Sequence, residues 1–349
     1  MNRKKFNVIF SISVGLILAI SLLFGFWKTS TNEEENYSGI GSSVTVSPDN
    51  KKIIFSYFQN NSAGLYQASV SGKNVDVLTY PETGYDISAQ FSTDGSKIAY
   101  IHRLVTEGEE PKQSLYIIDA SGGQPQQLTN DDYYVSEAAF SKDGTKIYFL
   151  NAGVYTNYSP ITGPRPHEFD IYEMNVDGTE IKRLTNYKNY SMSDITVSAD
   201  GKYLYFQMMN DEKMQEQSDT FEVFKEIYKF SLETGETEFS FVPEGEFGWG
   251  EVFGIAFSND ESQLAYSAVT PKSKTENYFK YELFVTNMET NSTTQITNLH
   301  SHASDPVFFN HNQQLLFVEQ YNWPGKPEKF QLWKVNVDGT DLEKIEIEM

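Results

Sequence analysis

Residues 140–150 read FSKDGTKIYFL. An Asp-Gly pair between two short apolar segments predicts a β-hairpin, because Asp hydrogen-bonds its own backbone at a turn and Gly accepts a positive φ. Nearly the same letters stand at 91–100, FSTDGSKIAY, and at 197–206, VSADGKYLYF. Repeats of this length are typical of solenoids, propellers and arrays, so the recurrence decides the architecture.

The hairpin occurs six times, and we name its two strands a and b. Its turn has an anchor residue at one equivalent position: Asp49, Asp94, Asp143, Asp200, Asp260 and His311. Strand b begins four residues after each anchor, at Ile53, Ile98, Ile147, Leu204, Leu264 and Leu315. Turn geometry accounts for the aspartates, so we assign them no catalytic role.

A second hairpin, of strands c and d, follows each first one. Strand c opens with an aliphatic–aromatic pair, at Leu65-Tyr66, Leu115-Tyr116, Ile171-Tyr172, Ile227-Tyr228, Leu283-Phe284 and Leu332-Trp333. Strand d follows twelve residues after that aromatic, at Leu78, Leu128, Leu184, Ser240, Ile296 and Ile345. Six units of four short antiparallel strands predict an all-β, six-bladed β-propeller over residues 43–349, because radial repetition leaves only short, protected sheet edges.

The repeat pattern FSxDGxKIxF…LYxxxxxGxxxxxLT resembles the TolB-like propeller, also called the PD40 or WD40-like repeat. The resemblance covers residues 43–349 and implies the fold. Similar TolB proteins act as interaction scaffolds of the cell envelope, but one fold hosts many functions. Each unit has its own strand d, including residues 342–349. We therefore expect no strand to be borrowed across the ring seam, and units one and six to meet by face packing alone.

The N-terminal segment differs from the repeats. Residues 6–27 carry no charge and follow Arg3, Lys4 and Lys5. About 20 apolar residues span a bilayer, and no Ala-x-Ala-like cleavage site follows in FGFWKTST. We expect residues 1–28 to be an uncleaved transmembrane helix with its N-terminus inside. Residues 29–42 are then a polar linker, and the propeller is extracytoplasmic. Secretion after signal cleavage is the alternative.

Composition limits the partners. The chain of 349 residues has a formal net charge of −21 and no cysteine. An acidic surface repels nucleic acid, and the lack of cysteine excludes disulfides and a thiol nucleophile. We expect a protein, a peptide or a cell-envelope glycan as the partner, and membrane contact through the N-terminal helix only.

The loops between b and c and the crossovers from d to the next a differ in length and carry many aromatic side chains. They lie at the end of the propeller opposite the uniform a–b and c–d turns. Because binding residues concentrate in long loops, we predict a ligand site at the mouth of the central channel on this face. The predicted ligand-binding residues are Trp249, Trp323, Phe247, Tyr134 and Tyr190. Packing between units is the alternative role for each.

Four of the five histidines fall in these same segments. His300 and His302, in LHSHAS, lie at i and i+2 and share one side if the backbone is extended. Oligogalacturonate lyases, which have a similar propeller, hold manganese with histidines that include a His-x-His pair. A divalent metal at His300 and His302 is therefore one hypothesis, and polar loop histidines without a metal the other. We expect no further cofactor.

Three interpretations of the function remain. The favoured one is a membrane-anchored binding module for a protein, peptide or cell-wall glycan. The first alternative is a metal-dependent, lyase-like carbohydrate-active enzyme that uses His300 and His302. The second is a structural part of an envelope assembly or sensor. The sequence has no G-x-S-x-G, H-E-x-x-H or P-loop motif, and we assign no catalytic residue.

Overall fold

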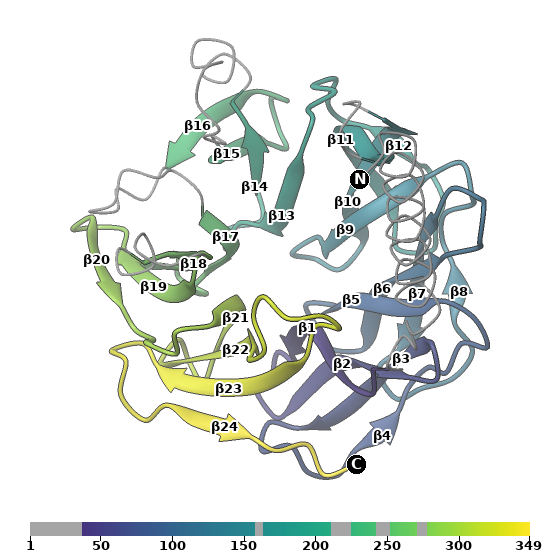
Figure 1. Ribbon diagram of the computed structural model, residues 1–349. Coiled ribbons are helices and arrows are strands. Elements are labelled where there is room, and N and C mark those ends of the chain that lie inside the picture. Colours follow the sequence, from purple (N-terminus) through teal and green to yellow (C-terminus); the bar gives the residue numbers. More distant parts are fainter. Residues whose placement is uncertain (1–36, 158–162, 211–224, 242–251, 271–277) are drawn as a thin grey trace, which may run out of the picture. The chain divides into compact units, whose positions relative to one another are not determined.

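The structure of the protein is a computed structural model that describes residues 37–157, 163–210, 225–241, 252–270 and 278–349. In these ranges the secondary structure is entirely β, and Ser38–Met349 form one compact unit (Figure 1). The predicted anchor, residues 1–28, lies outside the described residues. No helix in the described ranges is long and apolar enough to cross a membrane.

The described strands fall into six consecutive groups of four. Unit one has β1 (Gly39–Val46), β2 (Lys52–Gln59), β3 (Ser62–Ser69) and β4 (Asp76–Val77). Unit two has β5 (Tyr85–Phe91), β6 (Lys97–Leu104), β7 (Lys112–Asp119) and β8 (Gln126–Gln127). Unit three has β9 (Tyr134–Phe140), β10 (Lys146–Thr156), β11 (Arg165–Asn175) and β12 (Lys182–Arg183).

The second half of the chain repeats this order. Unit four has β13 (Met192–Val197), β14 (Tyr203–Met209), β15 (Lys225–Ser231) and β16 (Thr237–Phe241). Unit five has β17 (Val252–Phe257), β18 (Gln263–Val269), β19 (Tyr281–Asn287) and β20 (Ser292–Gln295). Unit six has β21 (His302–Phe309), β22 (Gln314–Gln320), β23 (Phe330–Asn336) and β24 (Glu343–Ile345).

The units form a β-propeller. Neighbouring strands within each unit pair antiparallel, in the order a, b, c, d. Figure 1 shows the units arranged in a ring, with the a strands β1, β5, β9, β13, β17 and β21 innermost. The first strand begins at Gly39, so the predicted linker boundary at residue 42 is wrong. Ile40 pairs with Tyr57 and is 8% exposed, and its burial extends the strand toward the N-terminus.

The repeated turn owes its shape to a side-chain network. In five units a serine two residues before the anchor donates to the anchor aspartate over 2.6–2.7 Å, as Ser141 does to Asp143. The serine oxygen in turn accepts the N–H of the residue that opens strand b. Hydrogen bonds donated to the anchor aspartate lower the pKa of Asp94, Asp143 and Asp260 to about 2, and the serine hydroxyl makes the largest contribution. The prediction that these aspartates shape turns is confirmed.

The core lies between neighbouring units. The predicted first residues of strand b are all 0% exposed: Ile53, Ile98, Ile147, Leu204, Leu264 and Leu315. The predicted aliphatic residues of strand c are 0–2% exposed: Leu65, Leu115, Ile171, Ile227, Leu283 and Leu332. Burying one such side chain stabilises a fold by about 1.5–3 kcal/mol. The two constant spacings of the sequence therefore mark the main packing positions.

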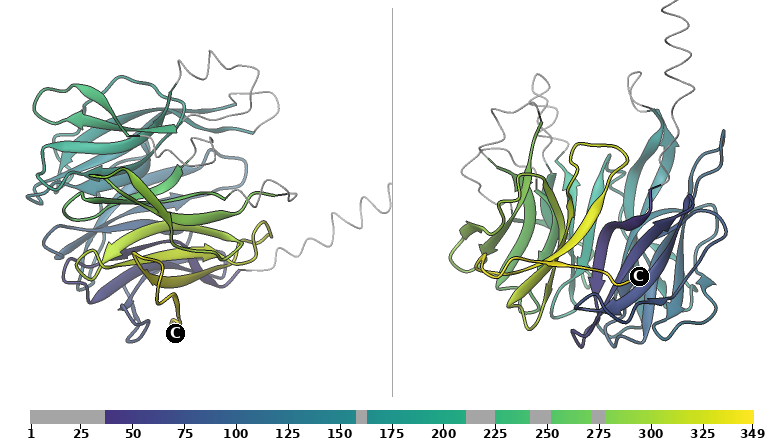
Figure 2. Two further views of the ribbon diagram at one scale, coloured as in Figure 1. Left: turned by 90° about the vertical axis from the view of Figure 1, so that its left-hand side faces the viewer. Right: turned by 60° about the horizontal axis from the view of Figure 1, so that its bottom comes forward.

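Among the strands that the structure describes, none is borrowed across the seam between units one and six, as predicted. β24 pairs with β23 of its own unit, and Ile345 packs in one cluster with Ile40. The expectation of face packing alone is wrong, because hydrogen bonds also cross the seam. The Glu348 N–H donates to the Gly72 carbonyl over 3.0 Å, and the C-terminal segment runs beside unit one (Figure 2). The Asn310 N–H donates to the Asn50 side chain over 2.9 Å.

Candidate functional site in the central channel

A cavity of about 800 Å³ lies at the centre of the ring and takes lining residues from all six units. Its walls are the a strands, from their middle to the a–b turns that follow, and Pro48, Thr93, Lys142 and Asn259 line it near those turns. The volume lies within the range of about 300–1,000 Å³ that is usual for ligand sites. The channel is therefore large enough to admit a ligand.

One position recurs around this cavity. The residues six before each turn anchor are Ser43, Ser88, Glu137, Asp194, Gly254 and Asp305, and all six line it. We call them the channel ring. The pairing of each a strand with its b strand shifts register at or next to this position. A β-bulge changes the direction in which a side chain points, and in every unit the irregularity lies at or next to the channel ring position.

Backbone conformation at the ring is unusual. Ser88, Asp194 and Asp305 have φ values of 53°, 59° and 50°, in the left-handed region that few non-glycine residues adopt. Gly254 has φ 58°, and a Cβ there would lie 2.9 Å from the backbone nitrogen of Asp305. Glycine is therefore required in unit five, because β17 and β21 approach each other closely at this point.

Three members of the channel ring are carboxylic acids. Burial, followed by the negative charge of Asp194, raises the pKa of Asp305 to about 7. Burial and Asp194 also raise the pKa of Glu137, although the Ile195 N–H donates to Glu137 Oε2 over 3.1 Å. Burial raises the pKa of Asp194, and nearby Lys225 opposes this shift. The three acids resist ionising together, so an added positive charge would be stabilised among them.

The rest of the cavity wall combines hydroxyl and amide groups, as at Ser92 and Asn259, with apolar side chains. Aromatic side chains line it three residues before the turn anchors of units two, three, five and six, at Phe91, Phe140, Phe257 and Phe308. Phe257 also packs on Tyr205, with ring centroids 4.5 Å apart. A ligand in the channel would thus meet both aromatic and polar side chains nearer the turns and carboxylic acids at the channel ring.

None of the three predicted ligand-binding residues that the structure describes, Tyr134, Tyr190 and Trp323, lines this cavity. Phe247 and Trp249 lie outside the described residues. Trp323 contacts unit five instead, where its Nε1–H donates to the Phe279 carbonyl over 2.6 Å. Tyr134 packs against Tyr155, with centroids 5.6 Å apart. Tyr190 lines a separate small pocket.

His300 and His302 do not share one side of a strand. His300 has φ 59°, so the expected extended backbone is interrupted there, and its N–H donates to Glu282 Oε1 over 2.7 Å. The ring of His302 lies 4.5 Å from that of Tyr281 and 4.8 Å from that of Trp323, and burial lowers its pKa. Among the residues that the structure describes, no three His, Cys, Asp or Glu side chains are grouped to hold a metal. The described residues thus do not fit the metal hypothesis.

The sequence reasoning missed Glu137, Asp194 and Asp305. The residues before each turn indicated only the apolar end of a hairpin, and the site was expected in the loops that vary in length. Aligning the six copies on the turn anchor places the three acids in one column. That alignment would have identified them, because residues at one position of a propeller repeat face the same axis.

Comparisons with known proteins agree on the fold. A family model described as the dipeptidyl peptidase IV N-terminal region matches residues 104–214. TolB from Acinetobacter baumannii is 16% identical with a TM-score of 0.56, over 90% of this chain and 65% of that chain. An oligogalacturonate lyase from Vibrio parahaemolyticus is 13% identical with a TM-score of 0.53, over 88% of this chain and 78% of that chain.

A prolyl endopeptidase structure is 12% identical with a TM-score of 0.57, over 90% of this chain and 51% of that chain. The chain thus spans about two thirds of the TolB length and about half of the peptidase length. No curated protein matches the chain. At these identities the similarity establishes the class, a β-propeller, and leaves the function to be argued from the site.

Proposed function

We propose that the protein is a binding module whose central channel receives a cationic segment of a protein or peptide partner. The observation that carries this proposal is the cavity of about 800 Å³ to whose lining units three, four and six each contribute one carboxylic-acid residue. A lysine or arginine side chain supplies a positive charge that stabilises the ionised form of these acids, while the phenylalanines of the cavity wall contact the rest of the segment.

The charge of the whole protein supports a cationic partner. The formal net charge of −21 attracts positively charged segments and repels polyanions such as acidic glycans. Inside the channel, a bound ammonium group lowers the pKa of each nearby carboxylic acid, so ionisation and binding favour each other. A peptide therefore fits the channel better than a uronate polymer does.

The setting of this module is part of the proposal. We propose a TolB-like propeller of six blades, held at the outer face of a membrane by residues 1–28. The six strand groups and the uncharged residues 6–27 support this arrangement. Protease added to intact cells should digest the propeller. Full protection of the propeller, or a mature N-terminus after Trp27, would remove the anchor from the proposal.

Affinity selection tests the binding function. The full-length chain, immobilised in detergent, is exposed to a randomised hexapeptide library with one fixed lysine and to the same library with glutamine in that place. We expect preferential retention of the lysine library, and loss of that preference in the triple variant Glu137→Gln/Asp194→Asn/Asp305→Asn.

A matched variant controls for net charge. Asp76, Glu107 and Asp132 are exposed and do not line the cavity, so Asp76→Asn/Glu107→Gln/Asp132→Asn removes the same number of acidic groups and at least as much negative charge. This control should keep the lysine preference. Equal retention of both libraries by the wild type, or equal loss in both triple variants, would contradict a cation-binding channel.

A further inference from the structure

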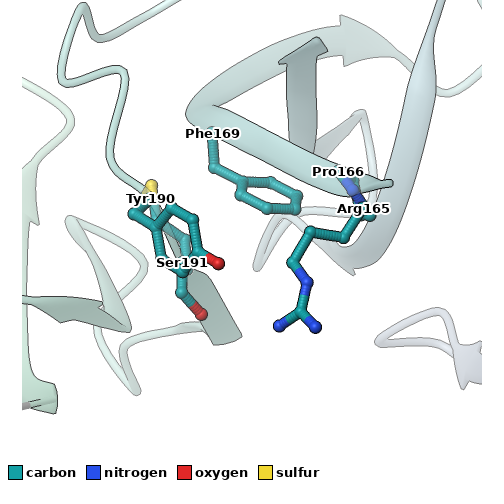
Figure 3. A pocket seen from close by; sticks show the side chains of 6 residues that line it. Arg165, Pro166, Phe169, Tyr190 and Ser191 are labelled. Carbon is teal, nitrogen blue, oxygen red and sulfur yellow. The ribbon is translucent and has the colours of Figure 1, made fainter. Parts of the chain in front are cut away.

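A second, smaller pocket lies away from the channel, between units three and four. It has a volume of about 280 Å³ and is lined by Arg165, Pro166 and Phe169 of β11, by Tyr190 and Ser191 of the following crossover, and by Met192 at the start of β13 (Figure 3). The volume is just below the usual range for drug-sized ligands, so the pocket fits a group of about one aromatic ring or one amino-acid residue.

The walls of this pocket are held in place by hydrogen bonds. The Phe169 N–H donates to the Asn189 carbonyl over 2.8 Å, and the Asn189 N–H donates back to the Phe169 carbonyl over 3.2 Å. The Asn189 side chain, 3% exposed, donates to the Met209 carbonyl over 2.9 Å. The crossover is thus fixed both to β11 and to the end of β14, and a pre-formed site loses less entropy on binding.

The interior of the pocket is apolar. Phe169 and Met192 are 6% and 4% exposed and contribute side chains to the lining. Tyr190 stacks on His167, with centroids 6.1 Å apart and planes at 25°, and His167 Nε2 lies 3.0 Å from Thr156 Oγ1. These contacts hold the Tyr190 ring as a rigid wall. A flat or branched apolar group can pack between that wall and Phe169.

The rim of the pocket is cationic. Arg165 is exposed, and its side chain makes no ion pair or hydrogen bond with any residue of the described ranges. The neighbouring cations differ, since Arg183 pairs with Asp170 and Lys188 with Glu168. Figure 3 shows the Arg165 guanidinium and the Tyr190 and Ser191 hydroxyls facing the same open space. A guanidinium with free donors binds a carboxylate in two parallel hydrogen bonds.

We propose that this pocket binds a carboxylate carried on an apolar group of about one ring. The carboxylate pairs with Arg165 and accepts from the Ser191 hydroxyl, and the apolar group packs on Phe169, Pro166 and the Tyr190 ring. The last residue of a peptide and a free arylalkanoate both have this chemistry. The site is independent of the channel, because its charge and its lining residues are different.

Ligand-observed NMR with the full-length chain in non-ionic detergent tests this site. The probes are N-acetylglycyl-phenylalanine, its C-terminal amide, and 3-phenylpropionate. We expect the acid to bind at least about tenfold more tightly than the amide, as for a charged hydrogen bond. Arg165→Gln should remove this difference. Ser191→Ala should weaken binding of the acid by a few-fold, because one hydroxyl donor is lost while the apolar walls remain.

Arg103→Gln is the matched control, since Arg103 is also exposed but does not line the pocket. It should bind both probes as the wild type does. If 3-phenylpropionate binds as tightly as the peptide acid, the ligand of this pocket is a free arylalkanoate. Tighter binding of the peptide acid identifies a peptide end. Equal binding of acid and amide, an acid–amide difference that persists in Arg165→Gln, or no binding of any probe at 10 mM would overturn the proposal.

Discussion

Replacing Asp305 by asparagine should change how the stability of the protein depends on pH. Asp305 lines the channel, and burial together with the charge of Asp194 raises its pKa from 3.8 to about 7. Between about pH 4 and pH 7 the folded chain keeps a proton that the unfolded chain has released. The stability that this protonated carboxyl contributes is therefore complete below about pH 4 and is lost as the pH rises toward 7.

The size of the effect follows from the pKa. Each pKa unit corresponds to about 1.4 kcal/mol, so ionising Asp305 in the folded state costs at most about 4 kcal/mol. The side chain is partly exposed, and solvent screens part of this energy. We expect Asp305→Asn to be more stable than the wild type at pH 8 by about 2 kcal/mol, and to differ little from it at pH 4.

Urea unfolding followed by tryptophan fluorescence at both pH values measures this difference. Asp76→Asn is the control, because Asp76 is an exposed residue of β4 and should show no such gain at pH 8. An equal loss of stability by Asp305→Asn at both pH values, or a gain that does not depend on pH, would contradict a raised pKa for Asp305.

Three further substitutions test the positioning of the loops and strands. Gly254→Ala should lower the free energy of unfolding by about 1–3 kcal/mol in urea titrations, because its Cβ would meet the Asp305 backbone and its φ is 58°; an unchanged midpoint would contradict this. Trp323→Phe should cost about 0.5–1.5 kcal/mol by removing the donor to the exposed Phe279 carbonyl, and should leave channel binding of peptides unchanged in anisotropy titrations. Glu282→Gln should destabilise by about 1–3 kcal/mol, because its carboxylate accepts from one hydroxyl and two N–H groups of the crossover; faster proteolysis of that crossover would report it.

Much of the fold could be predicted because two independent sequence signals mark each repeat, namely the residues of the turn and the constant spacing of the apolar residues. Asp143 marks the turn through its own hydrogen bonds, and Ile147 marks the core four residues later at 0% exposure. The start of the first strand was misplaced, since the residues at 39–42 carry little pattern and are ordered by pairing with β2.

The site was harder to predict, because aromatic residues in loops pack on one another as readily as they bind ligands. Trp323 appeared as an anchor for a ligand, yet its indole N–H already has the Phe279 carbonyl as a partner. The His300–His302 pair depended on an extended backbone, and a single left-handed residue removes that geometry. The carboxylic acids of the channel are far apart in the sequence. They lie at one cavity because the ring arrangement brings units three, four and six together.

The occupancy of the channel is the most direct test of the proposed function. The chain contains no cysteine, so Ala256→Cys places a single thiol at the channel wall and Tyr321→Cys places one on an exposed loop. The rate of labelling by a methanethiosulfonate reagent is measured with and without the best-retained lysine peptide. A channel that receives the cationic segment predicts that saturating peptide slows labelling at position 256 at least about tenfold and leaves position 321 unchanged. Unchanged labelling at position 256 with bound peptide would contradict the account.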